Sequence, residues 1–208
     1  MDERGPHLPL TVGFDLDMTL IDTRPGIKRC YDLLAAETGT AIDSDLVVSR
    51  LGPPVERELA NWFPAEAVPT VADRYRALYA EHGIEGSLPL PGAHEAIAAV
   101  HRQGGRVIVV TGKYEPNARR NLDAARLAVD GLHGTVFGAQ KGAVLRAEGA
   151  SVYVGDHLGD IEGARVAGAL AVAVATGPYT AAELAAAGAD AVLPELTGFP
   201  GWLADLRA

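Results

Sequence analysis

The sequence predicts an α/β fold: a parallel sheet with helices on both faces, and a smaller helical domain inserted into it. Two observations predict the sheet. Apolar runs of strand length recur without polar alternation, and a stretch with helical periodicity lies between one run and the next. Strands that are apolar throughout are buried on both faces, as in parallel sheets with helical crossovers. A third observation, a long helical stretch without any strand, predicts the insertion.

The elements of the core alternate along the chain. The predicted strands are short and rich in β-branched or small apolar residues, as buried strands are: Leu10–Phe14, Arg106–Val110, Gly134–Phe137, Ser151–Gly155, Ala169–Val174 and Ala191–Leu193. The predicted helices have apolar residues at a spacing of three or four: Gly92–Arg102, Glu115–Arg126, Gln140–Ala147, Leu158–Ala167 and Thr180–Ala187. This order favours a single sheet built from strand–helix–strand units.

Residues 23–88 interrupt the alternation. Their predicted helices are Pro25–Glu37, Asp43–Leu51, Val55–Asn61 and Ala65–His82. Pro25 falls in a first helical turn, where its missing N–H costs nothing. The segment Leu-Pro-Leu-Pro-Gly at 88–92 breaks helices and forms a connector. We therefore expect a core of residues 1–22 and 89–208, and a helical cap of residues 23–88 that acts as a lid.

The composition is that of an acidic globular protein. The chain of 208 residues has 18 Lys and Arg against 27 Asp and Glu, a net charge of −9. This charge argues against a surface that binds nucleic-acid phosphates, and the apolar runs are too short to span a membrane. A single cysteine, Cys30, and a charged amino-terminal segment, MDERGPH, predict a cytoplasmic protein without disulfide or signal peptide. The oligomeric state is left open.

Side chains that can take part in catalysis or bind a ligand follow four of the predicted strands. They are Asp15 and Asp17 after the first strand, Thr111 and Gly112 after the second, Lys141 beyond the third, and Asp156 and Asp160 after the fourth. In open parallel sheets, ligands bind at the carboxyl ends of the strands. We therefore expect these residues to form one site.

The residue types of this site suit phosphoryl transfer. Asp15 and Asp17, two apart in extended chain, face one space, where one can act as nucleophile and the other as general acid and base. With Asp156 and Asp160 the site is strongly negative and requires a cation; all-oxygen ligation favours Mg²⁺. Lys141 would neutralise a carboxylate and the transferred group, and the Thr111 hydroxyl would donate to an oxyanion. Together they predict an aspartyl-phosphate reaction.

These motifs resemble those of the haloacid dehalogenase-like hydrolase superfamily. They are F-D-L-D-M-T at 14–19, T-G at 111–112, Lys141, and G-D-x-x-x-D at 155–160. Residues 90–111 and 153–168 are also similar to its phosphoglycolate-phosphatase-like branch. The resemblance implies a Rossmann-like core with a helical cap at the first insertion point and a Mg²⁺-dependent phosphatase activity. Gly142, where that branch usually has Pro, and the short Lys141–Asp156 spacing depart from the branch.

The resemblance also implies the roles of the four acids. Asp15 matches the nucleophile, and Asp17 matches the general acid and base. The metal would be held by the carboxylates of Asp15 and Asp156 and by the backbone carbonyl of Asp17. Asp160 matches an acid whose role varies between metal support and holding the lysine.

The remaining matches concern the phosphate. Thr111 and Lys141 resemble the phosphate-positioning pair, and backbone N–H groups near Leu16 and Gly112 could add to the phosphate cradle. Lys113, two residues beyond Thr111, is expected at the rim of the site, with contact to the substrate as the alternative interpretation.

In the cap, Lys28, Arg50 and Arg57 are candidate anchors for a carboxylate or second anionic group of the substrate. For each of them, a solvated charged face is the alternative interpretation. The closed cap would leave little room for a macromolecule, so the expected partner is a small phosphorylated metabolite.

Three other functions remain open at this point. A sugar-phosphate phosphotransferase or mutase uses the same aspartyl-phosphate, so the motifs do not separate it from a phosphatase. A 2-haloacid dehalogenase is disfavoured, because that branch lacks the acid at the position of Asp17 and needs no metal. A catalytically silent binding module is disfavoured by the intact set of motif residues.

Overall fold

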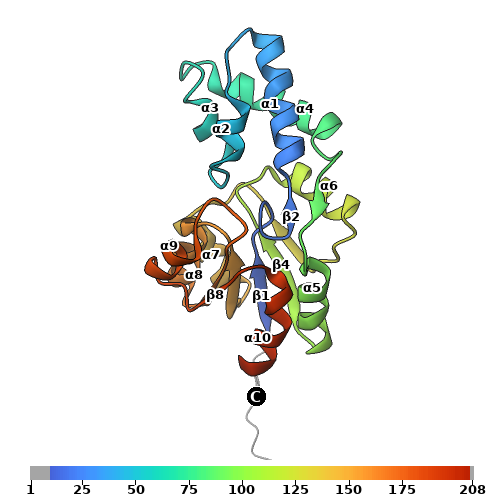
Figure 1. Ribbon diagram of the computed structural model, residues 1–208, viewed down its shortest axis with the longest axis vertical. Helices are drawn as coiled ribbons and strands as arrows, with labels where there is room; N and C mark the ends of the chain where they lie inside the picture. The colour runs from blue at the N-terminus through green and yellow to red at the C-terminus, as the bar shows by residue number, and fades with distance from the viewer. Residues whose placement is uncertain (1–9, 207–208) are drawn as a thin grey trace, which may run out of the picture.

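A six-stranded parallel sheet forms the core of the computed structural model, which describes residues 10–206 (Figure 1). The strands are β1 (Thr11–Phe14), β4 (Arg106–Val110), β5 (Gly131–His133), β6 (Val152–Gly155), β7 (Leu170–Val174) and β8 (Ala191–Leu193). Their order is β5-β4-β1-β6-β7-β8, so β1 lies inside the sheet and pairs with β4 and β6. The segment MDERGPH lies outside the described residues.

Helices cover both faces of the sheet, as predicted. One face packs against α5 (Ala93–Arg102), α6 (Glu115–Ala124) and α10 (Phe199–Leu206), the other against α7 (Ala139–Ala147), α8 (Leu158–Ala167) and α9 (Ala181–Ala186). Strand β4 shows the division clearly. Val107 and Val109 belong to the first hydrophobic cluster, whereas Ile108 and Val110 belong to the second. Alternate residues of a strand point to opposite faces, so an uninterrupted apolar run supplies both clusters.

Four helices between β1 and β4 form a separate hydrophobic cluster. These cap helices are α1 (Arg24–Thr38), α2 (Ser44–Val48), α3 (Val55–Leu59) and α4 (Val68–His82). The buried members of their cluster, such as Leu34, Leu59 and Tyr75, all come from residues 27–79. Figure 1 shows the cap helices beyond the carboxyl ends of the sheet strands. In the described part of the chain, no helix has the length and hydropathy needed to cross a membrane.

The two segments that join the cap helices to the core pair with each other. They form the short antiparallel strands β2 (Ile21–Asp22) and β3 (Leu88–Pro89), in which Ile21 lies opposite Pro89. Neither strand was predicted, because two residues carry no periodicity. The pairing holds both crossing points side by side.

The predicted third strand, Gly134–Phe137, is wrong. The strand lies three residues earlier, at Gly131–His133, where it pairs with β4 in parallel. After His133 the backbone turns, and Thr135 has a φ of 60°, which a strand residue does not adopt. The apolar residues Val136 and Phe137 pack against neighbours from this loop instead, Phe137 edge-on to the ring of His157.

The carboxyl-terminal segment holds two elements that were not predicted. The 3₁₀ turn η1 (Leu196–Gly198) leads into α10, and buried Phe199 packs edge-on against Phe14 of β1 with ring centroids 5.4 Å apart. Gly92, at the start of α5, lies against η1 and has a φ of 85°.

Gly92→Ala is expected to destabilise the protein more than Gly168→Ala. Both glycines have positive φ, so both variants carry about 1–2 kcal/mol of backbone strain. A methyl group on Gly92 would also lie 2.3 Å from the backbone nitrogen of Thr197, whereas at Gly168 nothing lies within 4 Å. We expect this overpacking to add about 1–3 kcal/mol, measured by urea unfolding. Equal losses in the two variants would contradict the contact.

Candidate active site

Asp15 and Asp17 follow β1 at the middle of the sheet's carboxyl edge, and a turn comes directly after them. The turn is closed by the N–H of Ile21, which donates to the carbonyl oxygen of Leu16 at 3.1 Å. Met18 has a φ of 61°, and the side chain of Leu16 is fully buried in the core. The turn itself, residues 18–20, follows Asp17, so Met18 adopts its left-handed conformation just beyond the two acids. Strain of this kind is frequent at functional sites.

Lys141 lies among buried acids. Its side chain is 2% exposed, and its ammonium donates to Asp15 Oδ1 at 3.1 Å and to Asp160 Oδ1 at 2.6 Å. The third donor goes to the hydroxyl of Tyr153 at 2.8 Å, which itself donates to the carbonyl oxygen of Val110 at 2.5 Å. All three protons of the ammonium are therefore used. Tyr153 was missed by sequence reasoning, although a tyrosine in a fully buried strand requires a hydrogen-bond partner.

Three carboxylates meet beside this lysine. Asp15, Asp156 and Asp160 each offer an oxygen, and these oxygens lie within 4.8 Å of one another. Asp160 already uses both of its oxygens, since Oδ2 accepts the N–H of His157 at 3.0 Å. Asp156 accepts the Thr19 hydroxyl at Oδ1, 2.7 Å, and across residues 10–206 its Oδ2 has no donor. A buried all-oxygen donor set of this kind fits a divalent cation.

Without a cation, the three clustered carboxylates carry more negative charge than the single ammonium of Lys141 can neutralise. Burial raises the pKa of Asp15 to about 7; Lys141 opposes the increase, while Asp160 and Asp17 add to it. Burial likewise raises the pKa of Asp156 well above its ordinary value, with Asp160 and Asp15 adding to the effect. Burial alone would lower the pKa of Lys141, but Asp15 and Asp160 raise it above its usual range. A bound cation would favour the ionised carboxylates.

Lys113 is a second buried ammonium, so the expectation that it lies at the rim is wrong. Its side chain is 8% exposed, and its ammonium donates to Asp17 Oδ1 at 2.9 Å. It also lies 4.1 Å from the ring centroid of Tyr79 on α4. Burial alone would lower the pKa of Lys113, but Asp17 and Tyr79 raise it above its usual range. The sequence indicated a special position for Lys113 only through its residue type, because the chain has 15 arginines and few lysines.

Thr111 and Gly112 lie where β4 ends. Thr111 is 1% exposed, and its hydroxyl oxygen accepts the N–H of Lys113 at 3.2 Å, so its proton can serve a ligand oxygen. A Cβ on Gly112 would lie 2.9 Å from the carbonyl oxygen of Gly52, in the loop between α2 and α3. A Cβ on Gly52 would meet the ring of His157 at 2.5 Å. This loop therefore closes onto the carboxyl edge of the sheet.

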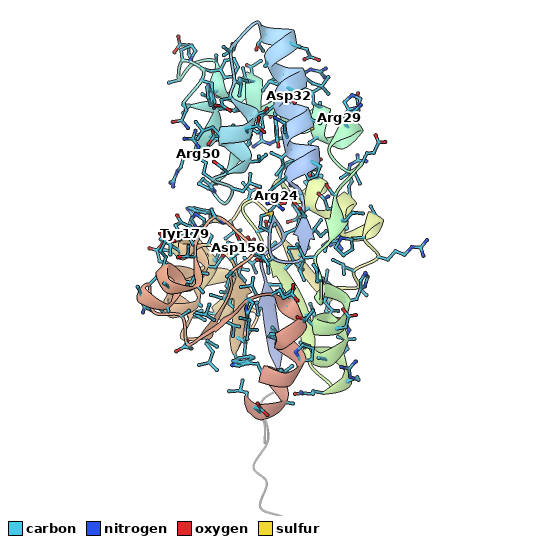
Figure 2. The ribbon with its side chains drawn as sticks, in the orientation of Figure 1. Arg24, Arg29, Asp32, Arg50, Asp156 and Tyr179 are labelled. Carbon is cyan, nitrogen blue, oxygen red and sulfur yellow. The ribbon has the colours of Figure 1, made fainter. Side chains whose placement is uncertain are left out.

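Asp156 lies at the edge of the core that faces the cap helices, with Arg50 on the cap side (Figure 2). Between cap and core is a pocket with about 750 Å³ of empty space, part of it open to solvent. Asp17, Gly112 and Lys113 line its core side, and α3 and α4 line its cap side. The pocket therefore lies where Asp17 and Lys113 can reach a ligand.

The predicted cap anchors occupy different places. Arg50 lines the pocket, where it pairs with Glu58 at 2.7 Å. Arg57 instead lies over the ring of Phe137, 5.5 Å from its centroid, and is not among the pocket's lining residues. Lys28 pairs with Asp45 at 2.8 Å and also stays outside the pocket.

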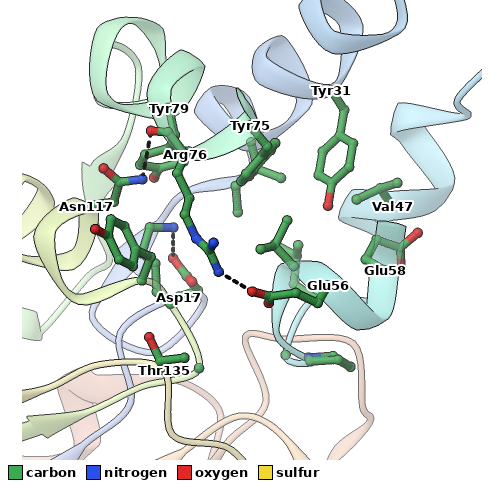
Figure 3. Close-up of a pocket in the computed structure, with 18 of the residues that line it drawn as sticks. Asp17, Tyr31, Val47, Glu56, Glu58, Tyr75, Arg76, Tyr79, Asn117 and Thr135 are labelled. Atoms are coloured by element: carbon green, nitrogen blue, oxygen red, sulfur yellow. Dashed lines mark hydrogen bonds and ion pairs between the residues drawn. The ribbon is translucent and has the colours of Figure 1, made fainter. Parts of the chain in front are cut away.

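Arg76 of α4 is the pocket cation that sequence reasoning missed. Figure 3 shows its side chain reaching into the pocket between Asp17 and Glu56. It pairs with Glu56 and with Asp73, the latter at 2.8 Å, and its guanidinium lies 5.0 Å from the ring centroid of Tyr114. Its Nε is buried and has no hydrogen-bond partner among the described residues. Its position one helical turn before Tyr79 could have indicated a shared face.

Comparison with known proteins agrees with this architecture. The model of the haloacid dehalogenase-like hydrolase family matches residues 12–165, and a second, HAD-hydrolase-like model matches residues 139–199. The chain is 29% identical to the phosphoglycolate phosphatase of Caulobacter vibrioides, covering 91% of this chain and 89% of that protein. It is 31% identical to the plasmid-encoded phosphoglycolate phosphatase of Cupriavidus necator, covering 96% of each.

Solved structures share the fold. The crystal structure of a predicted phosphatase from Clostridium acetobutylicum superposes with a TM-score of 0.83, covering 96% of this chain and 100% of that one at 20% identity. Together with the match of the family model over most of the chain, this similarity identifies the protein as a member of the haloacid dehalogenase-like hydrolase family.

Proposed function

We propose that the protein is a Mg²⁺-dependent phosphatase that hydrolyses a small phosphate monoester through an aspartyl-phosphate on Asp15. The observation that carries the proposal is the position of Asp15. It is buried at the carboxyl end of β1, 3.1 Å from the ammonium of Lys141 and among the three clustered carboxylates. The names of the relatives from Caulobacter and Cupriavidus, both phosphoglycolate phosphatases, support the same activity.

Asp15 supplies the nucleophile of the proposed reaction. Its carboxylate oxygen bonds to phosphorus as the bond from phosphorus to the ester oxygen breaks, and the Asp17 carboxyl gives its proton to that oxygen. Asp17, now ionised, takes a proton from the water that attacks the phosphoryl group. Inorganic phosphate leaves, and Asp15 and protonated Asp17 are restored.

The neighbouring groups stabilise the transferred phosphoryl group. The Thr111 hydroxyl donates to its oxygens, joined by the backbone N–H groups of Leu16 and Gly112, and the charge of Lys141 beside Asp15 offsets their negative charge. Asp160, whose two oxygens are already used, holds Lys141 in place. Mg²⁺, held by Asp15, Asp156 and the backbone carbonyl of Asp17, would supply Lewis-acid stabilisation of the phosphoryl oxygens.

The cap helices would make the site selective for small substrates. We take residues 23–88 as the cap domain and residues 1–22 and 89–208 as the catalytic core. The close approach of Gly52 to Gly112 supports closure of the cap over the site. Bulk water then has less access to the site, and a macromolecule does not fit in the remaining pocket.

Phosphoglycolate is the proposed substrate. Asp17 lines the pocket, so the alcohol part of the substrate would occupy it. Its carboxylate would then meet Arg76, whose buried Nε lacks a partner. A guanidinium edge binds a carboxylate with two parallel hydrogen bonds, which supports recognition by this residue.

Asp15→Asn is expected to lower turnover of p-nitrophenyl phosphate by about a thousandfold or more, because the nucleophile is lost. Asp205→Asn, a change to an exposed acid on α10, is the control and should keep full activity. Full turnover in Asp15→Asn would exclude the mechanism. Phosphorus NMR would separate release of free phosphate, the expected product, from transfer to a second ester, which a phosphotransferase would give.

Mg²⁺ is expected to stabilise the protein more at about pH 8 than at about pH 5. The pKa of Asp15 is raised from 3.8 to about 7, so the metal-free protein loses stability as the pH rises through this window. Mg²⁺ favours the ionised carboxylates, so its contribution increases over the same window. At 100 times its Kd the ion would add about 2.7 kcal/mol. Thermal unfolding measures the difference, and Asp156→Asn should abolish it. An increase in Tm that is independent of pH would contradict the linkage.

Arg76→Ala is expected to raise KM for phosphoglycolate by about 10- to 100-fold, because hydrogen bonds between charged groups are lost. The kcat/KM for p-nitrophenyl phosphate, which has no carboxylate, should stay within about twofold. Arg74→Ala, an exposed arginine of the same helix, is the matched control. An unchanged KM for phosphoglycolate would exclude Arg76 as its anchor.

A further inference from the structure

Lys113 is a buried charge for which the reaction above has no use. It lies two residues beyond Thr111, and its side chain is 8% exposed. A buried ammonium is costly unless it is paired and hydrogen-bonded. Lys113 therefore needs partners for its charge, and two neighbouring side chains supply them.

The first neighbour is Asp17. The ammonium of Lys113 and the hydroxyl of Thr23 both donate to the same carboxylate oxygen, Oδ1, at 2.9 and 2.7 Å. Across residues 10–206, Oδ2 accepts no hydrogen bond from the protein. Two donors on one oxygen fix the plane of the carboxyl group. They also direct the proton to Oδ2, the oxygen that remains available for transfer.

The second neighbour is Tyr79 of α4, one of the cap helices. Lys113 Nζ lies 4.1 Å from the centroid of its ring, in the geometry of a cation–π contact. The ring is fixed as well, because Tyr79 is 1% exposed and its hydroxyl donates to Asn121 Oδ1 of α6 at 2.9 Å. The ammonium is thus held between a carboxylate of the core and an aromatic ring of the cap helices.

We propose that Lys113 is a positioning residue that orients Asp17 for proton transfer and links this orientation to the cap helices through Tyr79. The inference rests on the proposed phosphatase function. When the cap helices lie on the core, the ring of Tyr79 holds the ammonium against Oδ1 of Asp17. The acid is then aligned at the moment at which the pocket closes.

The test compares two substrates of similar size whose leaving groups differ in basicity, phenyl phosphate and p-nitrophenyl phosphate. Phenolate is the more basic leaving group and depends more on a proton from Asp17. In Lys113→Met, kcat/KM for phenyl phosphate should fall at least about tenfold more than kcat/KM for p-nitrophenyl phosphate. Lys28→Met, a change to a partly exposed lysine of α1 that does not line the pocket, is the control. It should leave the ratio of the two kcat/KM values as it is in the wild type.

A second pair of variants tests the link to the cap helices and serves if Lys113→Met does not fold. Tyr79→Leu removes the ring but keeps Lys113 and Asp17. Like Lys113→Met, it should lower kcat/KM for phenyl phosphate more than kcat/KM for p-nitrophenyl phosphate. Tyr79→Phe keeps the ring and should preserve the wild-type ratio of the two values. Equal losses on both substrates in Lys113→Met and Tyr79→Leu would overturn the proposal. Wild-type protein that hydrolyses neither ester would instead refute the phosphatase function.

Discussion

The structure depends most on the placement of one ammonium group among buried carboxylates. Lys141 lies within hydrogen-bond distance of Asp15 and Asp160, and it is almost fully buried. Its partners come from the end of β1, from β6 and from α8, so the charge ties together elements that are distant in sequence. Removing water from these groups costs several kcal/mol per ion, and the mutual pairing offsets that cost. The same arrangement leaves a negative cluster that fits a divalent cation.

The two proposed roles of Asp15 and Asp17 correspond to two buried lysines. Lys141 accompanies the proposed nucleophile, and Lys113 accompanies the proposed acid and base. The environments differ, because Asp15 shares its lysine with Asp160, whereas Asp17 shares one oxygen between Lys113 and Thr23. Two carboxylates separated by one residue therefore have different hydrogen-bond partners. The cap helices contact the second lysine through the ring of Tyr79.

Much of the core could be predicted because its signals are local. Apolar runs such as Arg106–Val110 are strands, and the motif residues Asp15, Thr111, Lys141 and Asp156 do lie at one edge of the sheet. The prediction failed at β5, where Gly131–His133 pairs with β4 although its residues are poor strand formers. Neighbouring strands decide such a pairing, and periodicity does not record them.

The sequence by itself determined the fold class, the helical insertion and the set of motif residues, because buried strands and strand-end polar residues have recognisable local patterns. Only the tertiary structure decided which charges meet. Arg57 lies over Phe137 outside the pocket, whereas Arg76 enters it. Lys113 is buried against Asp17, from which 96 positions separate it. The partner of a charged side chain depends on how helices and strands pack across the sheet edge, and no spacing within one segment contains that information.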